Sequence, residues 1–386
     1  MDDVGTKIKN LIKRFEDLSA IGIANFSGAA ITILFWLYLA TIISNEEYGE
    51  VGYIIAIASI VAVVSQIGSN AAINVYTAKK IPIASTLLFI SLIISTISSL
   101  VVLIIIPNPV ISAYVIGYVI FGLSNAYLLG KAQFKKYSKI FIIQKIVFVT
   151  LALSLYYVLG TNGIVLGVGL SFLVHVYTAV KIFRESRIDF PLVRTKLHFM
   201  LNTYGKDISR VLFSQIDKII IAPFFGFAIL GNYYLGMQFF SGLVMVPSVV
   251  VHYTLTLDSA GKSTRRLKKW IIVISIIMAV LGFTVAPLIL PTLFPKFENA
   301  GTIIQILSLA IIPRTVSMMY TSKFLGSEKS QIVLIGSVIS LAVQIPLIFI
   351  LGSYIGVNGV AIAFGVAEFS LMIFYVIMGI KMKQRG

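Results

Sequence analysis

Apolar stretches of about 20 residues recur along the whole chain, and they limit the possible folds more than any other feature of the sequence. A membrane-spanning helix needs about 20 consecutive apolar residues, and such stretches follow one another from Ile21 to Ile380 with only short polar breaks. We assign about twelve spans, at residues 20–43, 50–77, 82–106, 110–130, 138–159, 162–182, 207–226, 230–256, 270–291, 300–322, 331–352 and 358–380. The sequence therefore predicts an all-α integral membrane protein.

The composition agrees with this prediction. Of the 386 residues, 58% are hydrophobic and 12% are charged, whereas a typical soluble domain has roughly 25% charged residues. A soluble fold of this size cannot bury so much apolar surface, so a separate catalytic domain is not expected. The chain has no cysteine, which excludes disulfides and thiolate metal sites.

The net charge of +16 is compatible with nucleic-acid binding, so the placement of the charges has to decide between the two classes. With a cytoplasmic N-terminus, 27 of the 31 Lys and Arg residues fall on the cytoplasmic side, and Lys296 is the only one in an outer loop. This asymmetry is what the positive-inside rule predicts for a membrane protein. We therefore expect a multi-pass protein of the plasma membrane, with both termini cytoplasmic and no nucleic-acid partner.

The two halves of the sequence resemble each other. A Gly-Asn-Gly pattern recurs at a constant shift of 196 residues, so that Gly160, Asn162, Gly163 and Gly169 match Gly356, Asn358, Gly359 and Gly365. Since the repeat contains six spans, both copies have the same orientation, and we expect two six-helix lobes, residues 1–190 and 191–386, related by a pseudo-two-fold axis along the membrane normal. Two such lobes are typical of secondary transporters, which bind substrate near the midplane at the repeat interface.

Three motifs give the chain a family resemblance. They are Leu-Ala-Thr-Ile-Ile-Ser-Asn-Glu-Glu-Tyr-Gly at 39–49, Gln-Ile-Asp-Lys-Ile-Ile-Ile at 215–221 followed by Leu-Gly-Asn-Tyr at 230–233, and Leu-Pro-Thr-Leu-Phe-Pro-Lys-Phe at 290–297. In order and spacing, the chain resembles the polysaccharide flippases of the multidrug, oligosaccharidyl-lipid and polysaccharide (MOP) exporter superfamily.

The resemblance implies a V-shaped pair of six-helix lobes that moves a lipid-linked oligosaccharide between leaflets by alternating access. Related peptidoglycan-precursor flippases usually have fourteen helices, which argues against lipid II as the substrate. Drug-exporting members share the architecture, so a drug or small-cation exporter is the competing interpretation.

Charged residues inside the predicted spans are the candidates for substrate binding, because a charge at the centre of a span costs about 2.5–3.5 kcal/mol. They are Lys145, Asp217, Lys218, Arg314 and Glu368, with one net positive charge. A positively biased cavity suits a phosphate or pyrophosphate head group. We therefore expect Arg314, Lys145 and Lys218 to bind the substrate.

Arg314 is the strongest of these candidates. It precedes Lys323 by nine residues, which is roughly 13 Å of helix rise from the cytoplasmic end. Its planar guanidinium can hold two phosphate oxygens at once, and the alternative is a structural ion pair with Asp217 or Glu368. For Lys145, the alternative is a stem that reaches the membrane interface.

The other polar residues of the spans are candidates for coupling transport to an ion. Asp217 and Lys218 point about 100° apart on a helix, so we expect one to line the cavity and the other to pack between helices. Glu368 is a candidate for proton uptake if it is unpaired, and the alternative is neutralisation by Arg314 or Lys218. His175 is a weaker candidate, because a histidine within a span is more often a hydrogen-bonded residue between helices than a proton relay.

Several kinds of chemistry have no support in the sequence. Residues 261–264 (Gly-Lys-Ser-Thr) resemble the end of a phosphate-binding loop, but Thr256 stands where the first Gly is required and no strand precedes it. No metal-ligand spacing and no pair of carboxylates on a long outer loop is present, so catalytic residues, metals and cofactors are not expected. A membrane-bound glycan polymerase or ligase is only a minor alternative.

The sequence as a whole predicts a non-enzymatic flippase for surface polysaccharide or glycan biosynthesis. Its expected partners are a lipid-linked oligosaccharide with a phosphate or pyrophosphate head group, membrane lipids and a candidate coupling ion. We expect the protein to act as a monomer.

Overall fold

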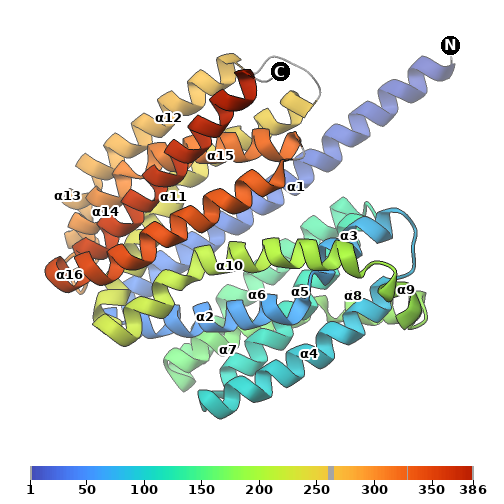
Figure 1. The fold of residues 1–386 in the computed structure, drawn as a ribbon. Coiled ribbons are helices and arrows are strands. Elements are labelled where there is room, and N and C mark those ends of the chain that lie inside the picture. Colours follow the sequence, from blue (N-terminus) through green and yellow to red (C-terminus); the bar gives the residue numbers. More distant parts are fainter. Residues whose placement is uncertain (1, 260–264, 328, 385–386) are drawn as a thin grey trace. The chain divides into compact units, whose positions relative to one another are not determined.

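The computed structural model describes residues 2–259, 265–327 and 329–384, and within these ranges the chain is helical with no β-strand (Figure 1). Residues 261–264, which resemble the end of a phosphate-binding loop, lie outside the described residues. The helices form two compact units, one of Met1–Thr32 and Ile54–Val211 and the other of Ile33–Tyr53 and Leu212–Gly386. The predicted lobe boundary at residue 190 stays a prediction.

The first unit is built around α5, which contacts the helices before and after it in the sequence. Asn108 caps the start of α5 by accepting a hydrogen bond from the Val110 backbone N–H (3.2 Å), as expected for an N-cap residue. The elements that lie wholly or partly in this unit are α1 (Asp2–Ile42), α2 (Asn45–Gln66), α3 (Ser69–Ala78), α4 (Ala84–Ile105), α5 (Pro109–Gly130), α6 (Phe134–Leu159), α7 (Thr161–Ser171), the 3₁₀ helix η1 (Phe172–His175), α8 (Val176–Glu185), α9 (Phe190–Arg194) and the first half of α10 (Leu197–Phe225).

The second unit is built around α11, which contacts α12, α14, α15 and α16. It also contains the second part of α1, the first turns of α2 and the second half of α10. Its other helices are α11 (Phe227–Ser259), α12 (Arg265–Thr284), α13 (Ala286–Leu293), α14 (Ala300–Leu309), α15 (Ile311–Gly326) and α16 (Ser330–Gln384).

The number of membrane spans agrees with the prediction. Within the described ranges nine helices are long and apolar enough to cross a membrane, or ten if α14 and α15, bent by 43°, form one span. The 55-residue α16 contains a break at Ile355 and Gly356 and therefore provides two spans. With α10, which is long enough but carries several charged side chains, the described residues provide twelve spans, and the all-α membrane fold is confirmed.

The predicted internal repeat is visible in the backbone. Gly160 and Gly356 have nearly the same dihedral angles, φ 62° and ψ −142° against φ 60° and ψ −139°, in a region that few residues except glycine adopt. Three residues later, a Cβ at either Gly163 or Gly359 would lie 2.0 Å from a backbone oxygen, that of Leu155 or of Leu351. Each unit therefore folds the Gly-x-x-Gly turn in the same way.

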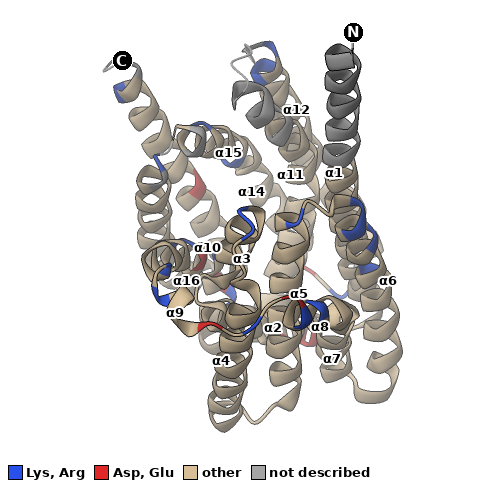
Figure 2. Ribbon diagram, turned by 90° about the vertical axis from the view of Figure 1, so that its right-hand side faces the viewer, with Lys and Arg blue, Asp and Glu red and all other residues tan. Residues whose placement is uncertain are grey.

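Charged side chains gather at one end of the helices in the first unit. In Figure 2, the Lys and Arg residues of this unit lie mainly near the end of α3, the start of α6, and α8 and α9. Residues 84–130 and 146–180, which include the α4–α5 and α6–α7 turns at the opposite end, contain no Lys, Arg, Asp or Glu. This polarity within one unit is the pattern that the positive-inside rule describes.

Motif residues explain why Ile33–Tyr53 packs in the second unit. Ser44 and Glu47 form a capping box at the start of α2, in which the Ser44 N–H donates to Glu47 Oε2 (2.8 Å) and the Glu47 N–H donates to Ser44 Oγ (3.2 Å). Lys296 Nζ donates to the Ile42 backbone oxygen at the end of α1 (3.1 Å). The motifs at 39–49 and 290–297 therefore meet in the fold.

The motif at 230–233 packs against the motif at 39–49, and glycines allow the two backbones to approach closely. A Cβ at Gly231 would lie 1.8 Å from the Asn45 backbone oxygen, and one at Gly49 would lie 2.1 Å from the Phe227 oxygen. Buried Tyr48 packs against the ring of Phe297, with ring centroids 5.5 Å apart. We call the residues 39–49, 230–233 and 290–297 the motif cluster, and these contacts hold its helices together.

Candidate functional site

Arg314 and Glu368 form an ion pair in the second unit. Arg314 lies in the first turn of α15, and its Nη1 is 2.9 Å from Oε1 of Glu368 on α16. Glu368 is fully buried, and its second oxygen, Oε2, has no hydrogen-bond partner. The sequence offers this ion pair as the alternative interpretation of both residues. The pair gives the buried carboxylate a counter-charge.

The guanidinium of Arg314 nevertheless remains accessible. Its side chain is 35% exposed, and its Cζ lies 5.8 Å from the ring centroid of Phe213 on α10, a cation–π contact. A guanidinium has five N–H donors in a fixed fork, and the hydrogen bond to Glu368 uses Nη1. Arg314 can therefore bind a second anion with its other donors.

Asp217 and Lys218 form a second buried pair, on α10. Lys218 Nζ lies 3.2 Å from Asp217 Oδ1 and donates to the Ser214 backbone oxygen (2.9 Å). Tyr233 of α11 donates to the other Asp217 oxygen, Oδ2 (2.8 Å). The two side chains start about 100° apart on the helix, but the flexible stem of Lys218 allows its ammonium to reach back to the carboxylate. Both residues are almost fully buried.

Lys145 is the mid-span cation of the first unit, and no acidic partner is within ion-pair distance in the described structure. It is half-buried on α6, and its Nζ lies 5.4 Å from the ring centroid of Phe141 and 5.9 Å from that of Phe148. Residues 51–184 contain no Asp or Glu. The aromatic rings thus provide the attraction that an acid provides elsewhere, and the positive charge of Lys145 is not neutralised.

His175 ends the short 3₁₀ helix η1 between α7 and α8. It is fully buried, its ring lies edge-on to Phe121 with centroids 5.1 Å apart, and neither of its ring nitrogens has a hydrogen-bond partner. Among the described residues, no three His, Asp or Glu side chains are grouped as metal ligands. His175 is therefore an isolated buried imidazole in the first unit.

Sequence reasoning did not identify the neighbours of these charges. Phe213 contacts Arg314 and Tyr233 contacts Asp217, each from a helix that the span pattern alone does not place beside the charged residue. Helical spacing offers a signal for Phe141 and Phe148, which lie four residues before and three after Lys145 and therefore share its face. The sequence offers no such signal for Tyr233, because its hydrogen bond to Asp217 joins two different spans.

Comparison with known proteins adds a family and a fold. Residues 38–257 match the model of the family described as Polysaccharide biosynthesis protein. None of the curated proteins matches the sequence significantly.

Solved structures give the fold. One is the inward closed conformation of the lipid II flippase MurJ, 14% identical, with a TM-score of 0.74 over 93% of this chain and 87% of that one. An inward-facing multidrug resistance MATE family transporter of the MOP superfamily is 15% identical, with a TM-score of 0.69 over 93% and 94%. A MOP superfamily transporter from Pyrococcus furiosus is 15% identical, with a TM-score of 0.59 over 95% of both chains.

Proposed function

The chain belongs to the polysaccharide biosynthesis protein family, and from this premise we propose that it is a flippase for lipid-linked oligosaccharide. The fold is that of MOP superfamily transporters and of a lipid II flippase. We propose that the protein moves its substrate from the cytoplasmic to the outer leaflet of the plasma membrane by alternating access, as one step in making a surface polysaccharide or glycan. The family match is the observation that carries this proposal.

The substrate feature that the charged residues suit best is a phosphate or pyrophosphate head group. Arg314 combines a mid-span position, a partly exposed guanidinium and unused donors, and it can bind phosphate oxygens in pairs. Lys145 adds a cation that no acid neutralises within the described structure. We propose that each of these two residues contacts the head group during transport, and that Lys218 contributes positive charge from its pair with Asp217.

The paired carboxylates suggest how binding is coupled to an ion. A proton on Glu368 would remove the negative charge that holds Arg314 and free the guanidinium for phosphate. Loss of that proton would restore the ion pair and favour release of the substrate. We propose Glu368 as the main coupling residue, with Asp217 and His175 as further candidates.

A drug or small-cation exporter is the second candidate, because a multidrug resistance transporter shares the fold. A cationic substrate needs free carboxylates. In the first unit, residues 51–184 contain none, and in the second unit Asp217 and Glu368 are each paired with a cation. These charges favour an anionic substrate over a cationic one.

Topology and assembly are also part of the proposal. The basic end of the first unit (Figure 2) supports an orientation in which this end is cytoplasmic. Both termini would then be cytoplasmic, and we expect the protein to act as a monomer.

A flipping assay in liposomes tests the proposal. The full-length protein is reconstituted with a fluorescent lipid-linked oligosaccharide, and the fraction that becomes accessible to a membrane-impermeant quencher is followed over time. We expect Arg314→Ala to slow flipping by about tenfold to a hundredfold, the effect of losing a charge-assisted hydrogen bond. Lys323→Ala, in the same helix α15 but with an exposed side chain, is the matched control and should flip at the wild-type rate.

A deletion strain separates the three functions. Accumulation of lipid-linked sugar in the inner leaflet supports the flippase, and altered drug tolerance without such accumulation would support the exporter instead. Chemical change of the lipid-linked sugar by the purified protein, without movement between leaflets, would point to an enzyme. Undiminished flipping by folded Arg314→Ala and Lys145→Ala variants would remove the head-group role of these residues.

A further inference from the structure

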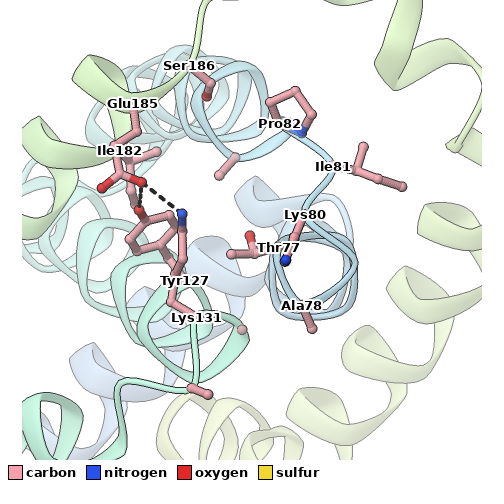
Figure 3. Close-up of a pocket in the computed structure, with 13 residues that line it drawn as sticks. Thr77, Ala78, Lys80, Ile81, Pro82, Tyr127, Lys131, Ile182, Glu185 and Ser186 are labelled. Atoms are coloured by element: carbon pink, nitrogen blue, oxygen red, sulfur yellow. Dashed lines mark hydrogen bonds and ion pairs between the residues drawn. The ribbon is translucent and has the colours of Figure 1, made fainter.

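A cavity of about 570 Å³ lies within the first unit, at the basic ends of its helices. Its walls come from the end of α3, the turn into α4, the end of α5 and the end of α8 (Figure 3). A cavity of this volume is in the range that accommodates small ligands. Because α4, α5 and α8 are parts of predicted spans that begin or end here, the cavity lies where the spans reach the membrane interface.

The polar groups of the cavity carry a net positive charge. Glu185 is the acidic residue of its lining, and it is bound by Lys131 Nζ (3.0 Å), by Lys181 Nζ (3.4 Å) and by the Tyr127 hydroxyl. Figure 3 shows Tyr127 and Lys131 both directed at Glu185. Lys80, on the opposite wall, has no ion-pair partner among the described residues. The carboxylate is therefore neutralised, and Lys80 remains available to an anion.

A buried hydroxyl in the lining also has no partner. Thr77 is 7% exposed, lines the cavity and has no hydrogen bond to its Oγ1. A buried polar atom without a partner is unfavourable, and a ligand oxygen in the cavity would give this hydroxyl an acceptor. Figure 3 shows Thr77 between Lys80 on one side and Tyr127 and Lys131 on the other.

Two strained turns hold these groups in place. Lys80 (φ 59°) and Ala132 (φ 54°) both have left-handed backbone conformations, which are unusual for residues other than glycine, and both line the cavity. Each follows a helix end with the same hydrogen-bond pattern: Ile81 N–H donates to the Tyr76 oxygen, and Gln133 N–H donates to the Leu128 oxygen, each at 2.9 Å. These two turns fix the backbone at the ends of α3 and α5, and they therefore fix the positions from which the side chains of Lys80 and Lys131 extend.

We propose that this cavity binds the phosphate of an anionic phospholipid head group. Lysine binds phosphate as a point charge, and basic cavities between spans at a membrane surface bind anionic head groups. The interfacial position favours a lipid as the source of the phosphate over a free ion in solution. Neither Arg314 nor Lys145 lines this cavity, and the proposal does not depend on the proposed transport function.

Binding of short-chain lipids to the purified full-length protein tests this site. Affinity for dioctanoyl phosphatidylglycerol, dioctanoyl phosphatidylcholine and inorganic phosphate is measured by microscale thermophoresis in detergent. We expect phosphatidylglycerol to bind more tightly than the other two and to raise the midpoint of thermal unfolding. Lys80→Gln should weaken phosphatidylglycerol binding about tenfold, since it removes a charge-assisted contact.

Neighbouring variants separate the site from general surface charge. Lys79→Gln removes the same charge one residue away, outside the cavity lining, and should leave the affinity within about twofold of wild type because exposed charges contribute little. Thr77→Val, which keeps the side-chain shape, should weaken binding by a few-fold without loss of stability.

Three results would overturn the proposal. The first is equal affinity for phosphatidylcholine, and the second is an equal effect of Lys79→Gln and Lys80→Gln. The third is binding of inorganic phosphate as tight as that of phosphatidylglycerol, which would assign the site to the free ion.

Discussion

The two units contain the same kind of turn, but the charged residues within their spans have different partners. Gly160 and Gly356 adopt the same backbone conformation at the same place in the repeat. In the second unit each mid-span cation lies beside a carboxylate, Arg314 beside Glu368 and Lys218 beside Asp217. The mid-span cation of the first unit, Lys145, lies between aromatic rings. The repeat therefore preserves the fold, while the charges have diverged between the copies.

This difference has an energetic meaning. A lone charge at the centre of a span costs about 2.5–3.5 kcal/mol, and a protein that retains one gains nothing in stability from it. A buried pair is different, because removing one partner leaves the other without compensation. We infer that Lys145 is present for its ligand, whereas Arg314 and Glu368 combine a structural role with binding.

The largest effect should come from the turn that the units share. Gly163→Ala and Gly359→Ala each place a methyl group 2.0 Å from a backbone oxygen, so the chain must move. We expect each variant to lose about 3 kcal/mol or more of unfolding free energy, measured by SDS titration of protein in dodecylmaltoside micelles.

Two other glycines provide the controls for this experiment. A Cβ at Gly22 in the first unit or at Gly365 in the second would meet no atom within 4 Å. Gly22→Ala and Gly365→Ala should therefore change stability little, or raise it by the better helix propensity of alanine. A large loss in one unit alone would show that the turns are not equivalent.

The next largest effect should come from breaking the Arg314–Glu368 pair. Glu368→Ala leaves the guanidinium without its carboxylate, and we expect a loss of about 2 kcal/mol. This is below the roughly 3–5 kcal/mol of a fully buried pair, because the Arg314 side chain is 35% exposed. The same SDS titration measures it.

A double variant shows whether the loss comes from the pair. Arg314→Met with Glu368→Leu removes both charges and should recover part of the stability lost in Glu368→Ala, since no unpaired charge remains. Wild-type stability of Glu368→Ala by itself would mean that the ion pair has no structural role.

The repeat, the spans and the mid-span charges were predictable because they depend on local order in the sequence. The twelve apolar windows and the mid-span charges are properties of contiguous segments, and the repeat is a match between two such segments at a constant shift of 196 residues. The ion pair of Arg314 with Glu368 was one of the alternatives that the sequence offered. The contacts of Tyr233 and Phe213 with these charges were not predictable, since both residues reach them from other helices. The sequence also carries no signal that Ile33–Tyr53 packs in the second unit, because this placement depends on close contacts such as that between Gly231 and Asn45.

Lys145 gives the sharpest test of the contrast between the units. Lys145→Met removes a charge that has no acidic partner, so we expect stability equal to or above wild type. Flipping should nevertheless fall about tenfold, the effect of one lost charge-assisted contact to the head group. The SDS titration and the liposome assay are run on the same preparation.

Lower stability of Lys145→Met together with normal flipping would contradict the proposed role of Lys145 in binding. If Lys145→Met is less stable but flips normally, the lysine contributes to packing through Phe141 and Phe148. Lys139→Met, six residues earlier on α6 and near the basic end of the unit, is the control and should change neither property.

The smallest effect should come from the contact that ties the end of α1 to the second unit. Lys296 donates to the Ile42 and Ile43 oxygens, at 3.1 and 3.4 Å, and a cation there also interacts favourably with the negative end of the helix dipole. Lys296→Met should therefore lower the unfolding free energy by about 0.5 kcal/mol, and Lys296→Arg should retain most of it. Since the contact lies in the motif cluster and not among the mid-span charges, flipping by the folded Lys296→Met protein should match wild type. A loss of flipping without a loss of stability would instead mean that the attachment of Ile33–Tyr53 to the second unit takes part in transport.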